Sequence, residues 1–229
     1  MKMRVYMGRI KTAASGGFTL LELLVAIGLS SIVVSGIYST YYSQQKSYVR
    51  QTEVSAMQQN LRAAMYHMER EMRMAGYDPT RRAGAGFQTA NSTSVRFTTD
   101  LTDDSGTGAP DGDADDADED ITYSLYDSDG DGNSDLCKKV GAGSNQPVAQ
   151  NIDALNIVYL DQNGNVTSTL SDIRSVQVSL LAKSGRRDQT YINNTTYRNQ
   201  NGTAIYNAPG DSFHRKLSTA QIKCRNMGL

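Results

Sequence analysis

The sequence predicts an α+β protein in which one long N-terminal helix packs on an antiparallel β-sheet. Three observations predict this class. An apolar stretch near the N-terminus continues without a break into an amphipathic helical pattern. Short runs of alternating apolar and polar residues follow Pro79, separated by clusters of glycine, asparagine and aspartate. With 229 residues, of which 38% are hydrophobic, the chain is long enough for one apolar helix and one modest domain.

The apolar stretch runs from Phe18 to Tyr38, and Glu22 is its single charged residue. A helix that rises about 1.5 Å per residue crosses the hydrocarbon core of a membrane, about 30 Å thick, in roughly twenty residues. The sequence therefore predicts a transmembrane helix over residues 18–42. A charge left unpaired in such a helix costs roughly 2.5–3.5 kcal/mol, so we expect Glu22 to have a positively charged partner.

The residues ahead of this stretch, 1–17, carry four basic side chains and no acidic one: Lys2, Arg4, Arg9 and Lys11. A secretory signal also begins with a basic segment, but its small-residue cleavage site follows the apolar run. Here Gly16 and Gly17 precede the apolar run. Cleavage after Gly17 would remove the basic segment and keep the helix. It would also give Phe18 a free amino group, a cation that can neutralise Glu22 of a neighbouring subunit.

The segment GFTLLE at residues 17–22 resembles the cleavage and methylation site of type IV prepilins and of type II secretion pseudopilins. The resemblance implies that a prepilin peptidase cuts after Gly17 and methylates the amino group of Phe18. It also implies that Glu22 docks incoming subunits during assembly, and that residues 1–17 are a cleaved leader. A generic signal anchor with an isolated glutamate is the alternative.

The helical pattern continues beyond the apolar stretch as an amphipathic half. Its apolar residues recur at intervals of three and four: Val54, Met57, Leu61, Ala64, Met65, Met68 and Met72. Gly76 and the dipeptide Asp78-Pro79 provide a stop. We therefore expect one helix over residues 18–75, whose amphipathic part, 43–75, packs its methionines on the sheet.

The remaining residues, 76–229, are predicted to form a β-rich head. Strands are expected at residues 95–99, 121–126, 135–140, 152–160, 173–182 and 217–224. Within the segment 161–165, Asn163-Gly164 favours a tight hairpin turn, because these residues accept positive φ angles. An acidic loop is expected over residues 100–135 and an exposed loop over residues 186–210.

The segment DSDGDGNSD at residues 127–135 places oxygen ligands at alternating positions, with a glycine at the sixth. It resembles the Ca²⁺ loops of EF-hand, dockerin and thrombospondin repeats. The candidate ligands are Asp127, Asp129, Asp131, Asn133 and Asp135. The twelfth position, normally a bidentate acid, is Lys138, and strands are expected where an EF-hand has helices. A Ca²⁺ site and a solvated acidic turn therefore both stay open.

A second acidic segment, DGDADDADED at residues 111–120, has no glycine in the corresponding place. Like charges at this density repel one another, so we expect an irregular, solvated segment. The alternative is that it lends a carboxylate to the loop at residues 127–135.

The chain has two cysteines, Cys137 and Cys224, each in an expected strand of the head. Because the head is expected outside the cytoplasm, they predict a disulfide that ties the last strand to the sheet. Such a bridge would contribute roughly 4–5 kcal/mol of stability. Two buried thiols are the alternative. A cysteine-containing metal site is not expected, because His67 and His214 lack ligand spacing.

Charge and motifs exclude several classes of function. Removal of the leader changes the formal net charge from −1 to about −5, so no nucleic-acid partner is expected. The sequence has no glycine-bounded serine nucleophile and no phosphate-binding loop, so no enzymatic activity is expected. The basic leader predicts a cytoplasmic N-terminus with the head on the other side of the membrane.

The strand pattern of the head, over residues 148–161, 173–181 and 217–226, resembles the PilW-type minor pilins of type IV pili. The J-type minor pseudopilins of type II secretion are similar as well. The first resemblance implies a type IV pilin fold and a subunit that primes filament assembly and lies at or near the tip. The alternatives are a minor pseudopilin and a calcium-dependent adhesive head displayed on a pilin anchor.

The same resemblance implies partners and a location. The partners would be other minor and major pilins, the prepilin peptidase and the inner-membrane assembly platform. The protein would lie in the bacterial inner membrane before assembly, and in a pilus that crosses the periplasm to the cell surface afterwards.

Overall fold

The structure is a computed structural model that describes residues 16–106, 108–116 and 118–228. The chain divides into two compact units, Met1–Val49 and Arg50–Leu229, and the second is called the head unit below. The described α-helix, α1 (Leu20–Met72), begins in the first unit and ends in the head unit. The predicted leader lies outside the described residues, apart from Gly16 and Gly17.

In the first unit, α1 is apolar and exposed along its length. Its most apolar window of 18 residues has a mean hydropathy of 2.2, and none of that window is buried. The helix is therefore long and apolar enough to cross a membrane. It begins at Leu20, two residues later than predicted, because the Thr19 hydroxyl accepts the Glu22 N–H at 3.2 Å and caps the first turn.

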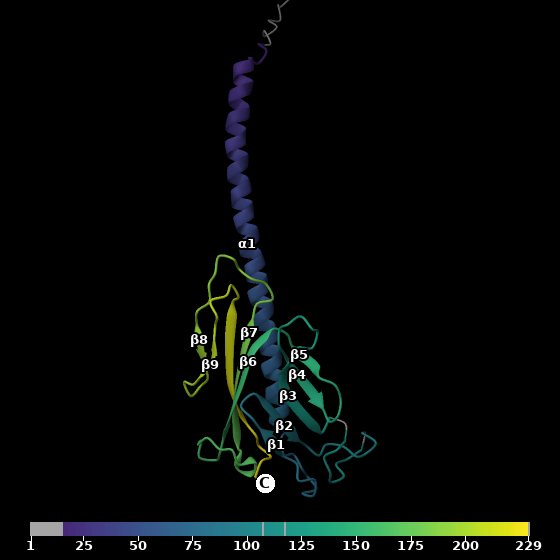
Figure 1. Ribbon diagram of the computed structural model, residues 1–229. Helices are drawn as coiled ribbons and strands as arrows, with labels where there is room; N and C mark the ends of the chain where they lie inside the picture. Colours follow the sequence, from purple (N-terminus) through teal and green to yellow (C-terminus); the bar gives the residue numbers. More distant parts are fainter. Residues whose placement is uncertain (1–15, 107, 117, 229) are drawn as a thin grey trace, which may run out of the picture. The chain divides into compact units, whose positions relative to one another are not determined.

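The head unit contains a five-stranded sheet in the order β1-β2-β3-β4-β5 (Figure 1). Its strands are β1 (Phe87–Ala90), β2 (Ser94–Thr98), β3 (Asp120–Tyr126), β4 (Asp135–Val140) and β5 (Gln146–Ala149). All its neighbouring strands are antiparallel. The strand β3 crosses the region predicted as an acidic loop, which leaves irregular acidic segments before and after it.

A second antiparallel sheet has three strands in the order β10-β7-β6. They are β6 (Ile152–Leu160), β7 (Ser175–Lys183) and β10 (Arg215–Lys223), and a 3₁₀ turn, η1 (Leu170–Asp172), precedes β7. A two-stranded sheet is formed by β8 (Thr196–Arg198) and β9 (Ala204–Asn207). The single antiparallel sheet expected from the sequence is therefore three sheets within the described residues.

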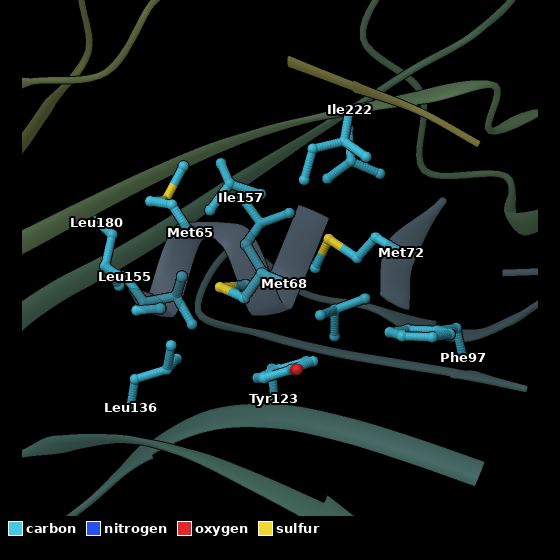
Figure 2. Close-up of a cluster of buried hydrophobic side chains, with 14 of the residues drawn as sticks. Met65, Met68, Met72, Phe97, Tyr123, Leu136, Leu155, Ile157, Leu180 and Ile222 are labelled. Atoms are coloured by element: carbon cyan, nitrogen blue, oxygen red, sulfur yellow. The ribbon is translucent and has the colours of Figure 1, made fainter. Parts of the chain in front are cut away.

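The core of the head unit forms where the end of α1 meets both larger sheets. The predicted apolar face of the helix is confirmed: Met57, Leu61, Ala64, Met65, Met68 and Met72 are buried, and Val54 is partly buried against them. Figure 2 shows Met68 between Tyr123 of β3 and Ile157 of β6. The methionines thus fill the space between two sheets, which long, unbranched side chains do well.

The segment 186–210 is mostly exposed, as predicted, but it is not a loop throughout, because it contains β8 and β9. Tyr197 pairs with Tyr206 across these strands, and their rings lie 6.5 Å apart. Such a cross-strand aromatic pair stabilises a short hairpin. The strands were missed in the sequence because three or four residues in an asparagine-rich segment show almost no alternation of apolar and polar residues.

The tight turn at residues 161–165 forms, but it does not join two full strands. Gly164 has φ of 82° and donates its N–H to Asp161 O, and Asp161 N bonds to Asn165 O. After the turn, the chain makes only an isolated bridge from Val166 to Leu160. It passes through η1 before β7 pairs with β6. The Asn-Gly signal therefore located the reversal, and β7 begins at Ser175, two residues after the predicted start of that strand.

The predicted disulfide is also wrong. Cys137 and Cys224 are both free and buried. Cys137 lies in β4 of the five-stranded sheet, whereas Cys224 follows β10 in the three-stranded sheet. The last strand, β10, pairs with β7 and not with β4. Within the described residues, the two cysteines are therefore not on neighbouring strands of one sheet.

Candidate functional sites at the helix start and in the acidic loops

The predicted cleavage site lies immediately before α1. Gly16, Gly17 and Phe18 have no regular secondary structure, and Phe18 is 90% exposed. The peptide bond between Gly17 and Phe18 is therefore outside the hydrogen-bonded helix, where a peptidase can reach an extended chain.

Glu22 is bound to the start of its own helix. Its Oε2 accepts the Thr19 N–H at 2.9 Å and the Thr19 hydroxyl at 3.0 Å, while the Glu22 N–H bonds to Thr19 Oγ1. This reciprocal arrangement is a capping box, in which two otherwise unsatisfied N–H groups of the helix start are paired. Oε1 accepts no hydrogen bond among the described residues, so it is free to bind an external cation.

Sequence reasoning missed Thr19 as a member of this site. The signal was present, because threonine followed three residues later by glutamate, at the start of an apolar helix, is the pattern of a capping box. This pattern was overlooked because Glu22 was interpreted as an isolated charge within the apolar stretch and not as part of the first turn of the helix.

Three of the five predicted Ca²⁺ ligands converge in the loop between β3 and β4. Carboxylate oxygens of Asp127, Asp129 and Asp131 lie within 4.8 Å of one another. The loop is turned by Asp127, which accepts the N–H groups of Gly130 at 2.8 Å and Gly132 at 3.0 Å. Three carboxylates at this separation provide hard oxygen ligands of the kind that Ca²⁺ takes.

The other two predicted ligands have different partners. The Asn133 side-chain oxygen accepts a 2.6 Å hydrogen bond from Lys183 Nζ. Asp135 is buried and accepts bonds from the Ser128 hydroxyl and the Asn151 N–H. Lys138, at the twelfth position of the loop, forms ion pairs with Glu71 of α1 at 2.9 Å and with Asp118 at 3.8 Å. The arrangement therefore supplies three acidic ligands to a cation and no bidentate acid.

The acidic segment before β3 is more structured than its charge predicts. Glu119 is fully buried, and its Oε1 accepts the N–H groups of Leu101 at 2.6 Å and Thr102 at 2.8 Å. Sequence reasoning did not single out Glu119, because it lies within an uninterrupted acidic run. Burial of one carboxylate among backbone N–H groups anchors this segment against the head.

Other carboxylates gather around Glu119. Oxygens of Asp113, Asp116 and Glu119 lie within 4.8 Å of one another, and so do those of Asp104, Asp111 and Asp113. Burial raises the pKa of Asp116 to about 6, and the negative charges of Glu119 and its neighbours raise it further. Within the described residues, none of these groups includes a carboxylate of the loop at residues 127–135. The alternative, in which the segment 111–120 supplies a ligand to that loop, is therefore not seen among the described residues.

Comparisons with known proteins address the helix start and the fold. Residues 13–38 match the family model of the prokaryotic N-terminal methylation motif. Among solved structures, the chain is similar to a type IV-like pilin from Thermus thermophilus, with a TM-score of 0.50 and 16% sequence identity. The similarity covers 74% of this chain and 97% of that chain, and at this identity it shows the fold alone. No curated protein matches the sequence.

Proposed function

We propose that this type IV pilin-like protein, which carries a prepilin methylation motif, is a minor pilin that primes the assembly of a type IV pilus at or near its tip. The observation that carries the proposal is the arrangement at residues 17–22. An exposed Gly17–Phe18 bond stands directly before a capped apolar helix whose first turn holds Glu22.

Processing would change the charge at this helix start. Cleavage after Gly17 leaves the amino group of Phe18 one residue before the capping residue Thr19. Methylation keeps that amine basic. The amine of one subunit can then bind Glu22 of the next, at the oxygen that Thr19 leaves free. In a membrane, a carboxylate paired in this way avoids roughly 2.5–3.5 kcal/mol of unpaired-charge cost.

The proposed partners are other minor and major pilins, together with the prepilin peptidase and the assembly platform of the inner membrane. Before assembly the protein would be a single-pass protein of that membrane with its N-terminus in the cytoplasm, and afterwards part of the pilus. The support for this is the apolar helix with the methylation motif at its start.

The test for the role of Glu22 separates processing from assembly. In Glu22→Ala, we expect mass spectrometry to find a chain that begins at methylated Phe18, and immunoblots of sheared filaments to lack the protein. Glu53→Ala is the matched control, since Glu53 lies on the same helix within the head unit and its ion pair is with the exposed side chain of Arg186. Normal incorporation of Glu22→Ala into filaments would overturn the proposed role.

The priming role is tested by deletion of the gene. Loss of pili, restored by the wild-type gene, is expected from a subunit that starts assembly. Normal piliation with defective secretion of folded proteins would instead identify the protein as a minor pseudopilin of a type II secretion system.

The convergence of Asp127, Asp129 and Asp131 supports a second function, a calcium-dependent binding head. We propose that these residues bind Ca²⁺ weakly, with a dissociation constant of about 10⁻⁴–10⁻³ M, because the bidentate acid is missing. Calorimetry on the full chain in detergent should show heat at millimolar CaCl₂ that Asp129→Ala with Asp131→Ala removes. Asp161→Ala, which alters an acidic turn elsewhere in the head, is the control. No heat from the wild type would end this proposal.

A further inference from the structure

The strand β10 leaves one edge of the three-stranded sheet open. In Figure 1 it is the yellow strand beside β7, and it pairs with β7 along all nine of its residues without a bulge. Cys224, the residue after β10, donates its N–H to Arg174 O. Because every second residue of an antiparallel strand bonds to its neighbour, this bond shows which residues of β10 bond to β7 and which face away from it. The N–H and C=O groups of Leu217, Thr219 and Gln221 therefore point away from β7. No strand of the described residues pairs with them.

The other outer strands of the two larger sheets are protected. β1 and β5 have four residues each, both contain a register shift, and β5 includes Pro147. β6 has a register shift, and its outer edge donates the N–H groups of Ile152 and Ile157 to Ser134 and Ser92. Short length, bulges, proline, charged side chains and covering segments are the usual devices that prevent unwanted pairing. Of these, β10 has only the charged side chains within the described residues: exposed Lys216 and Lys223 lie near its two ends, and residues 217–222 between them carry no charge.

A basic pocket lies where β10 ends. It has a volume of about 430 Å³, and three arginines line it together with one acid, Glu69. The arginines are Arg70 and Arg73 of the helix region and Arg225, two residues after β10, and the remaining lining residues are Tyr66, Met74 and Asn226. Arg73 pairs with Glu69, whereas the guanidinium groups of Arg70 and Arg225 have no hydrogen-bond or ion-pair partner among the described residues. Asn226 fixes this end of the chain by donating to the carbonyl oxygens of Arg73 and Met74.

We propose that the β10 edge and this arginine pocket together bind an extended acidic segment of a partner protein. The segment adds a strand beside Leu217–Gln221 through backbone hydrogen bonds and places carboxylates beside Arg70 and Arg225. Main-chain pairing supplies affinity in such strand addition, and charge-assisted bonds to arginine supply selectivity. The lysines at both ends of β10 favour the same acidic partner. The basic leader of this chain has the wrong charge to be the occupant.

The probes are synthetic peptides of the length of β10, built from alternating threonine and valine, with two glutamates at the C-terminal end, at the N-terminal end or at neither. Binding to the full chain in detergent is followed by amide hydrogen exchange. We expect a glutamate-bearing peptide to slow the exchange of the Leu217, Thr219 and Gln221 amides by at least about tenfold. Exchange at Ser218 and Ala220, whose amides face β7, should not change.

Two variants separate the edge from the pocket. Thr219→Pro removes an outward N–H that β7 does not use, so the fold is retained while peptide binding is lost. Thr219→Val is its matched control and should bind normally. Arg70→Ala with Arg225→Ala should weaken the glutamate-bearing peptide at least about tenfold and leave the uncharged peptide unaffected.

Unchanged exchange at Leu217, Thr219 and Gln221 with all three peptides at saturation would overturn the proposal. This measurement on the wild type stands even if Thr219→Pro fails to fold. Equal binding of all three peptides would remove the role of the arginine pocket. Dimerisation of the chain that Thr219→Pro abolishes would instead identify a second copy as the occupant and overturn the acidic partner.

Discussion

Tyr123, a fully buried residue of β3, donates a 2.5 Å hydrogen bond to Glu71 near the end of α1. Lys138 of β4 donates to the other oxygen of the same carboxylate at 2.9 Å. One glutamate of the helix thus satisfies polar groups from two neighbouring strands. Burial raises the pKa of the Tyr123 phenol, and its bond to Glu71 raises it further, so the phenol remains a donor at neutral pH.

Glu71→Ala should therefore destabilise the head more than the loss of one contact would. It leaves the Tyr123 hydroxyl without its partner in a site that is largely buried. It also leaves the Lys138 ammonium with exposed Asp118, 3.8 Å away, in place of its close pair with Glu71. We expect the free energy of unfolding to fall by about 3 kcal/mol, whereas Tyr123→Phe, which leaves the ion pair intact, should cost about 1–2 kcal/mol. Urea unfolding of the full chain in detergent, followed by circular dichroism, measures both.

The control is Glu69→Ala, two residues earlier in the same helix. Its ion pair with Arg73 is exposed on the arginine side, and surface pairs of this kind contribute about 0.5 kcal/mol or less. If Glu71→Ala cost no more than Glu69→Ala, the link between helix and sheet would be an ordinary surface interaction.

Met68 is the second point at which helix and sheets depend on each other. It is fully buried between the two larger sheets (Figure 2). Met68→Ala should lower the free energy of unfolding by about 2–5 kcal/mol, because the cavity cannot close without moving both sheets. Tyr66→Ala, at a site on the same helix that is 64% exposed, should change it by at most about 0.5 kcal/mol. Similar losses for the two variants would contradict this account of the core.

The elements that could be predicted from the sequence are those with a clear period or clear boundaries. The methionines of α1 recur at helical intervals, whereas β4 and β6 are runs bounded by glycine, asparagine and aspartate, and both strands have the predicted bounds. The missed strands β1, β5, β8 and β9 have three or four residues, too few for a period of two to appear. Their pairing depends on tertiary contacts, such as the Phe87 ring against Tyr159, which no local pattern contains.

The candidate sites divide in the same way. The ligands Asp127, Asp129 and Asp131 lie in one loop, so their spacing alone predicts that they converge. The hydrogen-bond partners of Asn133 and Asp135 could not be predicted from the loop, because Lys183 and Asn151 come from other parts of the chain. The free edge of β10 could not be predicted from the sequence either, because it depends on which strand lies at the edge of the three-stranded sheet.

The two thiols should be unreactive in the folded protein. Burial raises the pKa of Cys224 to about 12, and it also raises the pKa of Cys137. Because the thiolate is the reactive form, N-ethylmaleimide should label neither cysteine in the folded chain and both in denaturant, without prior reduction. Intact-mass spectrometry counts the labels. Labelling that requires a reductant would show that the two cysteines are bridged after all.

Asp116 should make the head more stable in mild acid than at neutral pH. Its Oδ2 is buried without a hydrogen-bond partner among the described residues, and its folded pKa of about 6 lies above the ordinary value of 3.8. Between these two values the folded state holds the proton more tightly than the unfolded chain does. The stability contributed by this group is therefore complete below pH 3.8 and is lost as the pH rises through about 6. In the presence of a chelator, Asp116→Asn should raise the free energy of unfolding above about pH 7 and have little effect below about pH 4.

Asp161→Asn is the matched control of opposite sign. The N–H groups of the turn, that of Asn165 first, lower the pKa of Asp161, so its stabilising contribution is present above pH 3.8 and is lost as the pH falls below that value. This variant should therefore destabilise the head at neutral pH, and the difference should disappear in acid. Urea unfolding of both variants across the pH range gives the two curves. If Asp116→Asn lowered stability at neutral pH, as Asp161→Asn is expected to do, then neither burial of the Asp116 carboxylate nor repulsion from its acidic neighbours would govern its pKa.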